Sequence, residues 1–277
     1  MNVRTDLALE ERELREASEE HAPRGVTCEE WDEGAVHVTK VHIRTKAGAA
    51  ALHKPIGSYV TLEMPAQQVR SAPSDCADVL FGALRALLPE TGDVLVVGLG
   101  NEAVTPDAIG PRTLRHVLVT RHLRRDMPDL FDKFRQVSAI APGVLGRTGM
   151  ESAEIVRGIV GKIKPAYVIA IDALAAAKPG RLCTSIQLAD TGIIPGSGVQ
   201  NDRAALNRGT LGVPVFAVGV PTVCDLRSLL ESQEQMIVTP SDIDMRVNDL
   251  SRIVSSGLNR ALHPTVPPQD LAEFVGG

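Results

Sequence analysis

From residue 93 onward, short apolar runs alternate with amphipathic segments along the chain. The apolar runs predict buried strands at Val94–Leu99, Gln136–Ala141, Tyr167–Ile171, Leu182–Leu188 and Val213–Val218. Apolar residues recur at helical spacing in Ala108–Arg125, Met150–Ile163 and Ser241–Leu262. Because strands and helices alternate, we expect an α/β fold with a mostly parallel twisted sheet flanked by helices on both faces.

A different pattern precedes residue 93. A polar, charged leader occupies residues 1–25, and the residues after it alternate between apolar and polar types. The predicted elements are two strands, the turn between them and two helices: Ala35–Arg44, Ser58–Glu63, Lys54–Gly57, Leu9–His21 and Cys76–Leu88. We therefore expect one domain over residues 7–277, with a smaller β-rich N-terminal appendage (7–92) on an α/β core (93–277).

Composition narrows the class of protein. Aromatic residues make up 3% of the 277 residues, so the core must be built from Val, Ile, Leu and Ala. The net charge of −5 is spread along the chain, which argues against direct nucleic-acid binding because that needs a basic face. The sequence has no signal peptide and no apolar run long enough to cross a membrane. We expect a cytoplasmic protein with reduced cysteines and no membrane partner.

Two aspartates are candidates for chemistry because of where they follow the predicted strands. In open α/β sheets, active groups collect at the carboxyl ends of the strands. Asp172 directly follows the run Tyr167–Ile171, and Asp107 lies in the loop that leaves Val94–Leu99. Taken singly, each is also explained as an ordinary capping or first-turn residue. As a pair at neighbouring strand ends they can share a proton, one acting as a base on water and the other as an acid.

Cofactor and metal motifs are weak in this sequence. Gly98, Gly100 and Ala103 fit part of a dinucleotide-binding pattern, but Pro106 delays the helix that would face the phosphates, and Asp107 would repel them. The seven histidines form no H-E-x-x-H motif and no close cluster. We therefore predict no cofactor and no metal.

Long segments of the chain, in order, resemble the germination proteases, the spore-protein endopeptidases of endospore-forming bacteria. The matching segments are Val3–Ala8, Gly57–Glu63, Val96–Pro111, Leu118–Leu123, Val137–Gly149, Ile169–Ala176, Asp190–Gly198, Gly219–Val223, Met236–Pro240 and Gly257–His263. The resemblance implies an aspartic-type endopeptidase with Asp107 and Asp172 as its catalytic residues. It also implies a fold related to hydrogenase maturation endopeptidases, whose metal-dependent members add a histidine that is not evident here.

Asn101, Asp190 and Ser197 are candidates for supporting the two aspartates. Asn101 follows Gly100 in the loop that carries Asp107. Asp190 begins a D-T-G tripeptide like that of pepsin-like proteases, but those enzymes are all-β, whereas this chain is predicted to be α/β. Ser197 lies in a turn-rich segment and lacks the G-x-S-x-G setting of a nucleophile.

The resemblance also implies how the protein is made and what it acts on. Residues 1–6 would be a propeptide that the enzyme removes itself by cleaving Asp6–Leu7. The substrates would be small acid-soluble spore proteins, the assembly a homotetramer, and the location the cytoplasm of the forespore and the spore core. Two alternatives stay open: a metal-dependent maturation-type endopeptidase on the same fold, and a catalytically silent binding protein.

Overall fold

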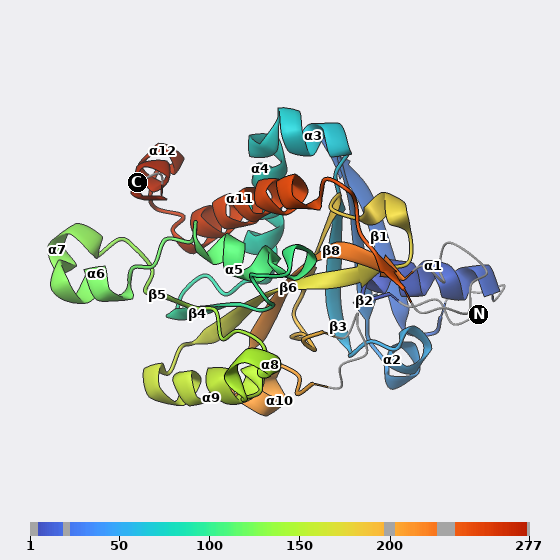
Figure 1. Ribbon diagram of the computed structural model, residues 1–277, viewed down its shortest axis with the longest axis horizontal. Coiled ribbons are helices and arrows are strands. Elements are labelled where there is room, and N and C mark those ends of the chain that lie inside the picture. The colour runs from blue at the N-terminus through green and yellow to red at the C-terminus, as the bar shows by residue number, and fades with distance from the viewer. Residues whose placement is uncertain (1–4, 19–22, 197–202, 226–235, 276–277) are drawn as a thin grey trace.

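One sheet runs through the computed structural model, which describes residues 5–18, 23–196, 203–225 and 236–275 (Figure 1). The strands in these residues are β1 (Val26–Glu33), β2 (Val36–Ile43), β3 (Gly57–Glu63), β4 (Val94–Gly98), β5 (Val137–Ile140), β6 (Tyr167–Ala176), β7 (Ser185–Ala189), β8 (Val215–Asp225) and β9 (Ile237–Val238). Their order across the sheet is β1-β2-β3-β7-β8-β6-β4-β5, and β9 pairs with β8.

Helices cover both faces of this sheet, as the sequence predicts. They are α1 (Ala8–Ser18), α2 (Lys46–Leu52), α3 (Ala66–Ser71), α4 (Pro73–Leu87), α5 (Ile109–Leu114), α6 (Arg121–Asp126), α7 (Pro128–Phe131), α8 (Leu145–Thr148), α9 (Ser152–Ile163), α10 (Arg208–Leu211), α11 (Ile243–Leu262) and α12 (Pro268–Val275). Helices α4 and α11 pack on one face and α9 and α10 on the other (Figure 1). No helix among these residues is long and apolar enough to cross a membrane.

The strands of the sheet are only partly parallel, so the expectation of a mostly parallel sheet is wrong. Among the described residues, the parallel pairs are β4–β5, β4–β6 and β6–β8, and the other pairs are antiparallel. A parallel neighbour needs a crossover of about a dozen residues or more, whereas Gly34-Ala35 alone joins β1 to β2. This short connection folds β2 back antiparallel to β1.

The N-terminal strands extend the core sheet itself. Strand β3 pairs with β7 over Tyr59–Glu63, and β7 pairs with β8 in the centre of the sheet. Val38 and Leu62 contribute to the same apolar cluster as the core strands. The β-rich region expected as an appendage is thus continuous with the α/β core.

The prediction of a single helix over Ala108–Arg125 is wrong, because the chain forms α5 and α6 with an irregular segment between them. Tertiary hydrogen bonds hold that segment. The side chain of Asn259 accepts from the backbone N–H of Leu118 and donates to the carbonyl of His116. The hydroxyl of Thr120 accepts from the N–H of Val137 at the start of β5. These contacts outweigh the helical periodicity of the segment.

Candidate active site

Asp172 lies within a long central strand rather than at its end. Strand β6 is buried along its length and continues past Asp172 to Ala176, so the side chain does not cap a following segment. Asp172 is 3% exposed, and its Oδ1 accepts a hydrogen bond of 2.9 Å from the N–H of Ala173. Its Oδ2 has no hydrogen-bond partner among the described residues. Burying such an oxygen is costly, and the cost is smaller when the carboxyl group is protonated.

Asp107 reaches the same place from a tight loop after β4. The loop ends in a 3₁₀ turn, Thr105–Asp107, and the Oδ2 of Asp107 accepts a 2.7 Å hydrogen bond from the N–H of Asn101. Gly100 has φ +110°, and a Cβ there would lie 2.0 Å from the carbonyl oxygen of Asp107. The hydroxyl of Thr222 on β8 donates to the carbonyl of Pro106 at 2.6 Å. The loop can therefore pack this closely only with glycine at position 100.

Both carboxyl groups face a cavity of about 300 Å³. Its walls are largely apolar and include Leu99, Val104 and Leu174. Arg203 also lines the cavity. The sequence alone does not single out this residue, because it belongs to no recognisable motif. The cavity thus combines two acids with one cation in a mainly apolar setting.

Burial and mutual repulsion change the acidity of the pair. Burial raises the pKa of Asp172 well above its ordinary value of 3.8, the negative charge of Asp107 raises it further, and the N–H of Ala173 opposes the rise. Burial also raises the pKa of Asp107, while the N–H of Asn101 and the charge of Arg203 partly offset that rise. Two interacting carboxyl groups of this kind hold one proton between them over a wide pH range.

The other sequence candidates lie in different places. The structure brings Asn101 next to Asp107, where its side chain also accepts from the N–H of Ala103. Asp190 is exposed at the end of β7 and accepts a 2.8 Å hydrogen bond from the N–H of Ser58, away from the residues that line the cavity. Ser197 falls outside the described residues.

The N-terminal segment is buried against the extension of β6. Asp6 is 7% exposed and Leu7 fully buried. The N–H of Asp6 donates to the carbonyl of Ala175 at 2.9 Å, and the N–H of Ala175 donates to the Asp6 carboxylate at 2.8 Å. Asp6 is close enough to Asp172 for its negative charge to raise the pKa of Asp172. The bond expected to be cleaved therefore lies near the acid pair.

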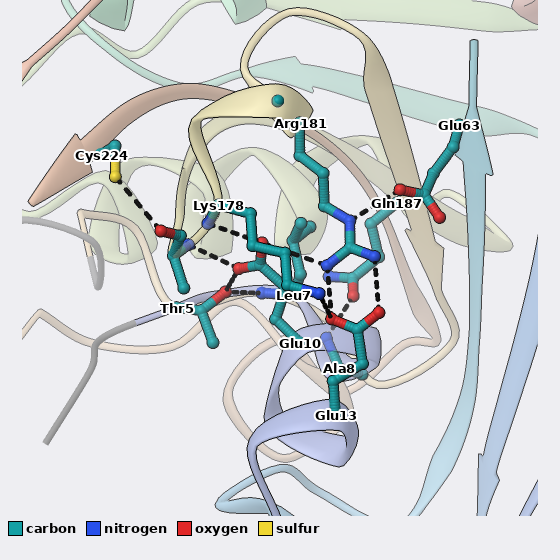
Figure 2. A network of polar contacts seen from close by, with 12 residues as sticks. Thr5, Leu7, Ala8, Glu10, Glu13, Glu63, Lys178, Arg181, Gln187 and Cys224 are labelled. Atoms are coloured by element: carbon teal, nitrogen blue, oxygen red, sulfur yellow. Dashed lines mark hydrogen bonds and ion pairs between the residues drawn. The ribbon is translucent and has the colours of Figure 1, made fainter. Parts of the chain in front are cut away.

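A network of charges anchors the same segment (Figure 2). Glu10, 1% exposed, accepts from the hydroxyl of Thr5, from the N–H of Lys178 and from Arg181. Arg181 also pairs with Glu13. Burial alone would raise the pKa of Glu13, but hydrogen bonds from Arg181 and Lys178 outweigh it and lower the pKa to about 2. Helix α1 is thus fixed to the loop that follows β6.

Comparison with known proteins decides the family. The sequence profile described as germination protease matches residues 3–233. A germination protease of Clostridium perfringens strain SM101 is 40% identical to this chain, over 99% of each. The chain belongs to the germination protease family. The resemblance found in the sequence is therefore confirmed, and the protein is a protease.

Further relatives bear the same name. The germination protease of Bacillus velezensis is 41% identical over 97% of this chain and 76% of its own length. That of Priestia megaterium is 33% identical over 99% of this chain and 97% of its own. Among solved structures, a NiFe hydrogenase maturation protease from Thermococcus kodakarensis is similar, with a TM-score of 0.39, 17% identity, and coverage of 64% of this chain and 98% of that one. The family match over residues 3–233 spans the positions of Asp107 and Asp172 and part of the N-terminal segment.

Proposed function

We propose that this protease is an endopeptidase that degrades small acid-soluble spore proteins during germination, with Asp107 and Asp172 as its catalytic pair. The family supports the substrate class. The observation that supports the chemistry is the pair of buried carboxyl groups, both with raised pKa, in one cavity. Such a pair supplies a base and an acid at the same pH.

The environments of the two carboxyl groups suggest which one acts as the base and which as the acid. Asp107 accepts the Asn101 N–H and lies near Arg203, and both favour the ionised form. Asp172 is more deeply buried and is repelled by Asp107, which favours the protonated form. In the proposed mechanism, Asp107 takes a proton from water as the water attacks the peptide carbonyl carbon. Asp172 then gives its proton to the nitrogen that leaves.

The enzyme is proposed to be made as a zymogen that removes residues 1–6 by cleaving Asp6–Leu7. The position of Asp6 beside β6, near the acid pair, supports this step. Assembly as a homotetramer and a location in the forespore and spore core are also part of the proposal. Analytical ultracentrifugation of the purified enzyme measures the assembly state, and fractionation of spores measures the location.

Substitution of each aspartate tests the mechanism. Asp107→Asn and Asp172→Asn are compared with Asp132→Asn, an exposed site on the loop after α7. Acid–base groups contribute about 10²–10⁴-fold, so each site variant should lose that much activity on spore protein and keep its N-terminus uncut by mass spectrometry. Folded site variants with wild-type cleavage rates would overturn the assignment.

A chelator distinguishes the metal-dependent alternative. Within the described residues, no group of three or more His, Cys, Asp or Glu side chains is arranged to hold a metal ion. We expect cleavage by the wild-type enzyme to continue at an unchanged rate in excess EDTA. Loss of activity that nickel or another divalent cation restores would favour the metal-dependent mechanism instead.

A further inference from the structure

The side chain of Gln187 forms hydrogen bonds with the backbone on both sides of Leu7. Gln187 belongs to β7 and is 7% exposed. Its Nε2 donates a 3.2 Å hydrogen bond to the carbonyl oxygen of Asp6, and its Oε1 accepts one of 2.7 Å from the N–H of Ala8 (Figure 2). The carbonyl of Asp6 belongs to the bond that we propose is cleaved. One amide thus contacts the scissile carbonyl and the second residue after it.

The strand register places Gln187 in line with Asp172. Asp172 of β6 is the partner of Gly219 on β8, and Gly219 is in turn the partner of Gln187 on β7. Residues paired across neighbouring strands point to the same face, so both side chains rise from one face at two strand spacings, about 10 Å. This is the face on which Leu7 and Ala8 lie, because Leu7 packs against Leu174, two residues beyond Asp172.

The side chain of Leu174 packs over Gly219, in the space between Asp172 and Gln187. A Cβ at this position would lie 2.3 Å from the Cδ1 of Leu174. A second cavity, of about 230 Å³, is lined by Gly219, Gln187 and Asp6, and it shares Leu174 with the cavity of the acid pair. The negative charge of Asp6 raises the pKa of Asp172, so Asp6 lies within electrostatic reach of that carboxyl group. The two cavities therefore meet at Leu174, with Asp172 in the first and Gln187 and Asp6 in the second.

We propose that Gln187 is a further catalytic residue, whose Nε2–H stabilises the oxyanion on the scissile carbonyl while its Oε1 holds the substrate backbone two residues further on. The inference rests on the proposed cleavage of Asp6–Leu7. Water adds to the carbonyl carbon of Asp6 and gives one proton to the ionised Asp107. The C=O bond becomes C–O⁻, which faces Nε2–H of Gln187. When the C–N bond breaks, Asp172 gives its proton to the Leu7 nitrogen. The products are a carboxyl group on Asp6 and an amino group on Leu7.

A structural role would explain the same two hydrogen bonds, because a buried amide must be paired. The two roles predict different kinetics. A residue that only anchors the N-terminal segment of the intact chain has no effect once the enzyme acts on a separate substrate. A residue that binds the scissile carbonyl affects every substrate, and it does so mainly in kcat because the oxyanion exists only in the transition state.

The test uses the full-length enzyme and a synthetic peptide with the sequence of residues 3–10. The variants are Gln187→Ala, which removes both contacts, and Gln187→Glu, which keeps the acceptor for Ala8 N–H but replaces the donor. The control is Gln67→Glu on α3, an exposed glutamine. Loss of one oxyanion donor costs about 10²–10³-fold, so both Gln187 variants should lose that much kcat on the peptide, with the control unchanged.

A modified peptide tests the second contact. An ester linkage in place of the amide at the position of Ala8 removes the N–H that Oε1 accepts. With wild-type enzyme the ester should be bound about three- to tenfold more weakly than the amide, as expected for one hydrogen bond. With Gln187→Ala the two peptides should bind equally, whereas an equal penalty in both enzymes would overturn the contact.

The results separate this inference from the proposed function. If wild-type enzyme does not cut the peptide or its own chain between Asp6 and Leu7, the proposed cleavage fails. The folding of Gln187→Ala is checked by circular dichroism and thermal unfolding. If wild-type enzyme cuts both substrates and folded Gln187→Ala keeps kcat within fivefold of wild type, the proposed role of Gln187 is wrong but the proposed cleavage stands. Gln187→Glu gives the same decision if the alanine variant does not fold.

Discussion

Replacing Gly100 with alanine tests whether the position of Asp107 is decisive. The new Cβ would lie 2.0 Å from the carbonyl oxygen of Asp107, about 1.4 Å closer than an ordinary contact of 3.4 Å. The backbone of Asp107 must therefore move by about that distance, or Gly100 must leave φ +110°. The unfavourable φ costs about 1–2 kcal/mol and the overpacking about 1–3 kcal/mol. We expect Gly100→Ala to lower the free energy of unfolding by about 2–5 kcal/mol.

Gly100→Ala should also lower the activity of the molecules that remain folded. A misplacement of about 1 Å costs roughly 10²-fold in rate, so kcat should fall by at least that factor under conditions where the variant is folded. Urea unfolding gives the stability and peptide cleavage the rate. The control is Gly158→Ala in the exposed interior of α9, where no described atom lies within 4 Å of the added Cβ. It should gain about 0.5–1 kcal/mol and keep full activity. A folded Gly100→Ala enzyme with wild-type kcat would refute this account of the loop.

Three further predictions concern stability. Leu7→Ala should lower the free energy of unfolding by about 2–5 kcal/mol in urea, because Leu7 is fully buried. Arg181→Met should cost about 3–5 kcal/mol, because it leaves Glu10 buried without its cation, and Arg181→Met combined with Glu10→Gln should recover part of the loss in the same assay. Asp172→Asn should unfold at a higher temperature than wild type at neutral pH. The unfolded chain loses this proton near pH 3.8 whereas the folded protein keeps it up to the raised pKa of Asp172, so the wild-type carboxyl group costs stability as the pH rises above 3.8. The difference should therefore vanish in calorimetry below about pH 3.8, where both states bind the proton.

Much of the core and the acid pair follow from local sequence patterns. The apolar runs at β4 and β6 are buried on both faces, and such strands are nearly continuous in Val, Ile and Ala. Asp107 and Asp172 are predictable as neighbours because β4 and β6 are parallel and β4 ends beside Ile171, the residue before Asp172. Arg203 is not predictable in this way, because no local sequence pattern places it beside the cavity that it lines.

Neither the antiparallel strands of the sheet nor the position of Gln187 can be predicted from a local sequence pattern, because both depend on contacts between distant parts of the chain. Strand β1 is an exposed edge strand with polar residues at Glu29 and Glu30, so it lacks the alternation that marks a half-buried strand. Gln187 looks like any polar residue in a short strand. Its importance arises from the register of three strands, through Gly219, and from a backbone segment about 180 residues away.

The extension of β6 past β4 places the proposed cleavage site and Asp172 of the acid pair along the same strand. Asp172 faces the cavity, and three residues later the same strand holds Asp6 through Ala175. The backbone between them is paired with β8, with one irregularity after Leu174, so no free loop intervenes. Groups built on strands keep their geometry better than groups on loops. In the proposed mechanism the costly burial of an acid in a strand serves function, because the strand that buries Asp172 would also align the peptide to be cleaved.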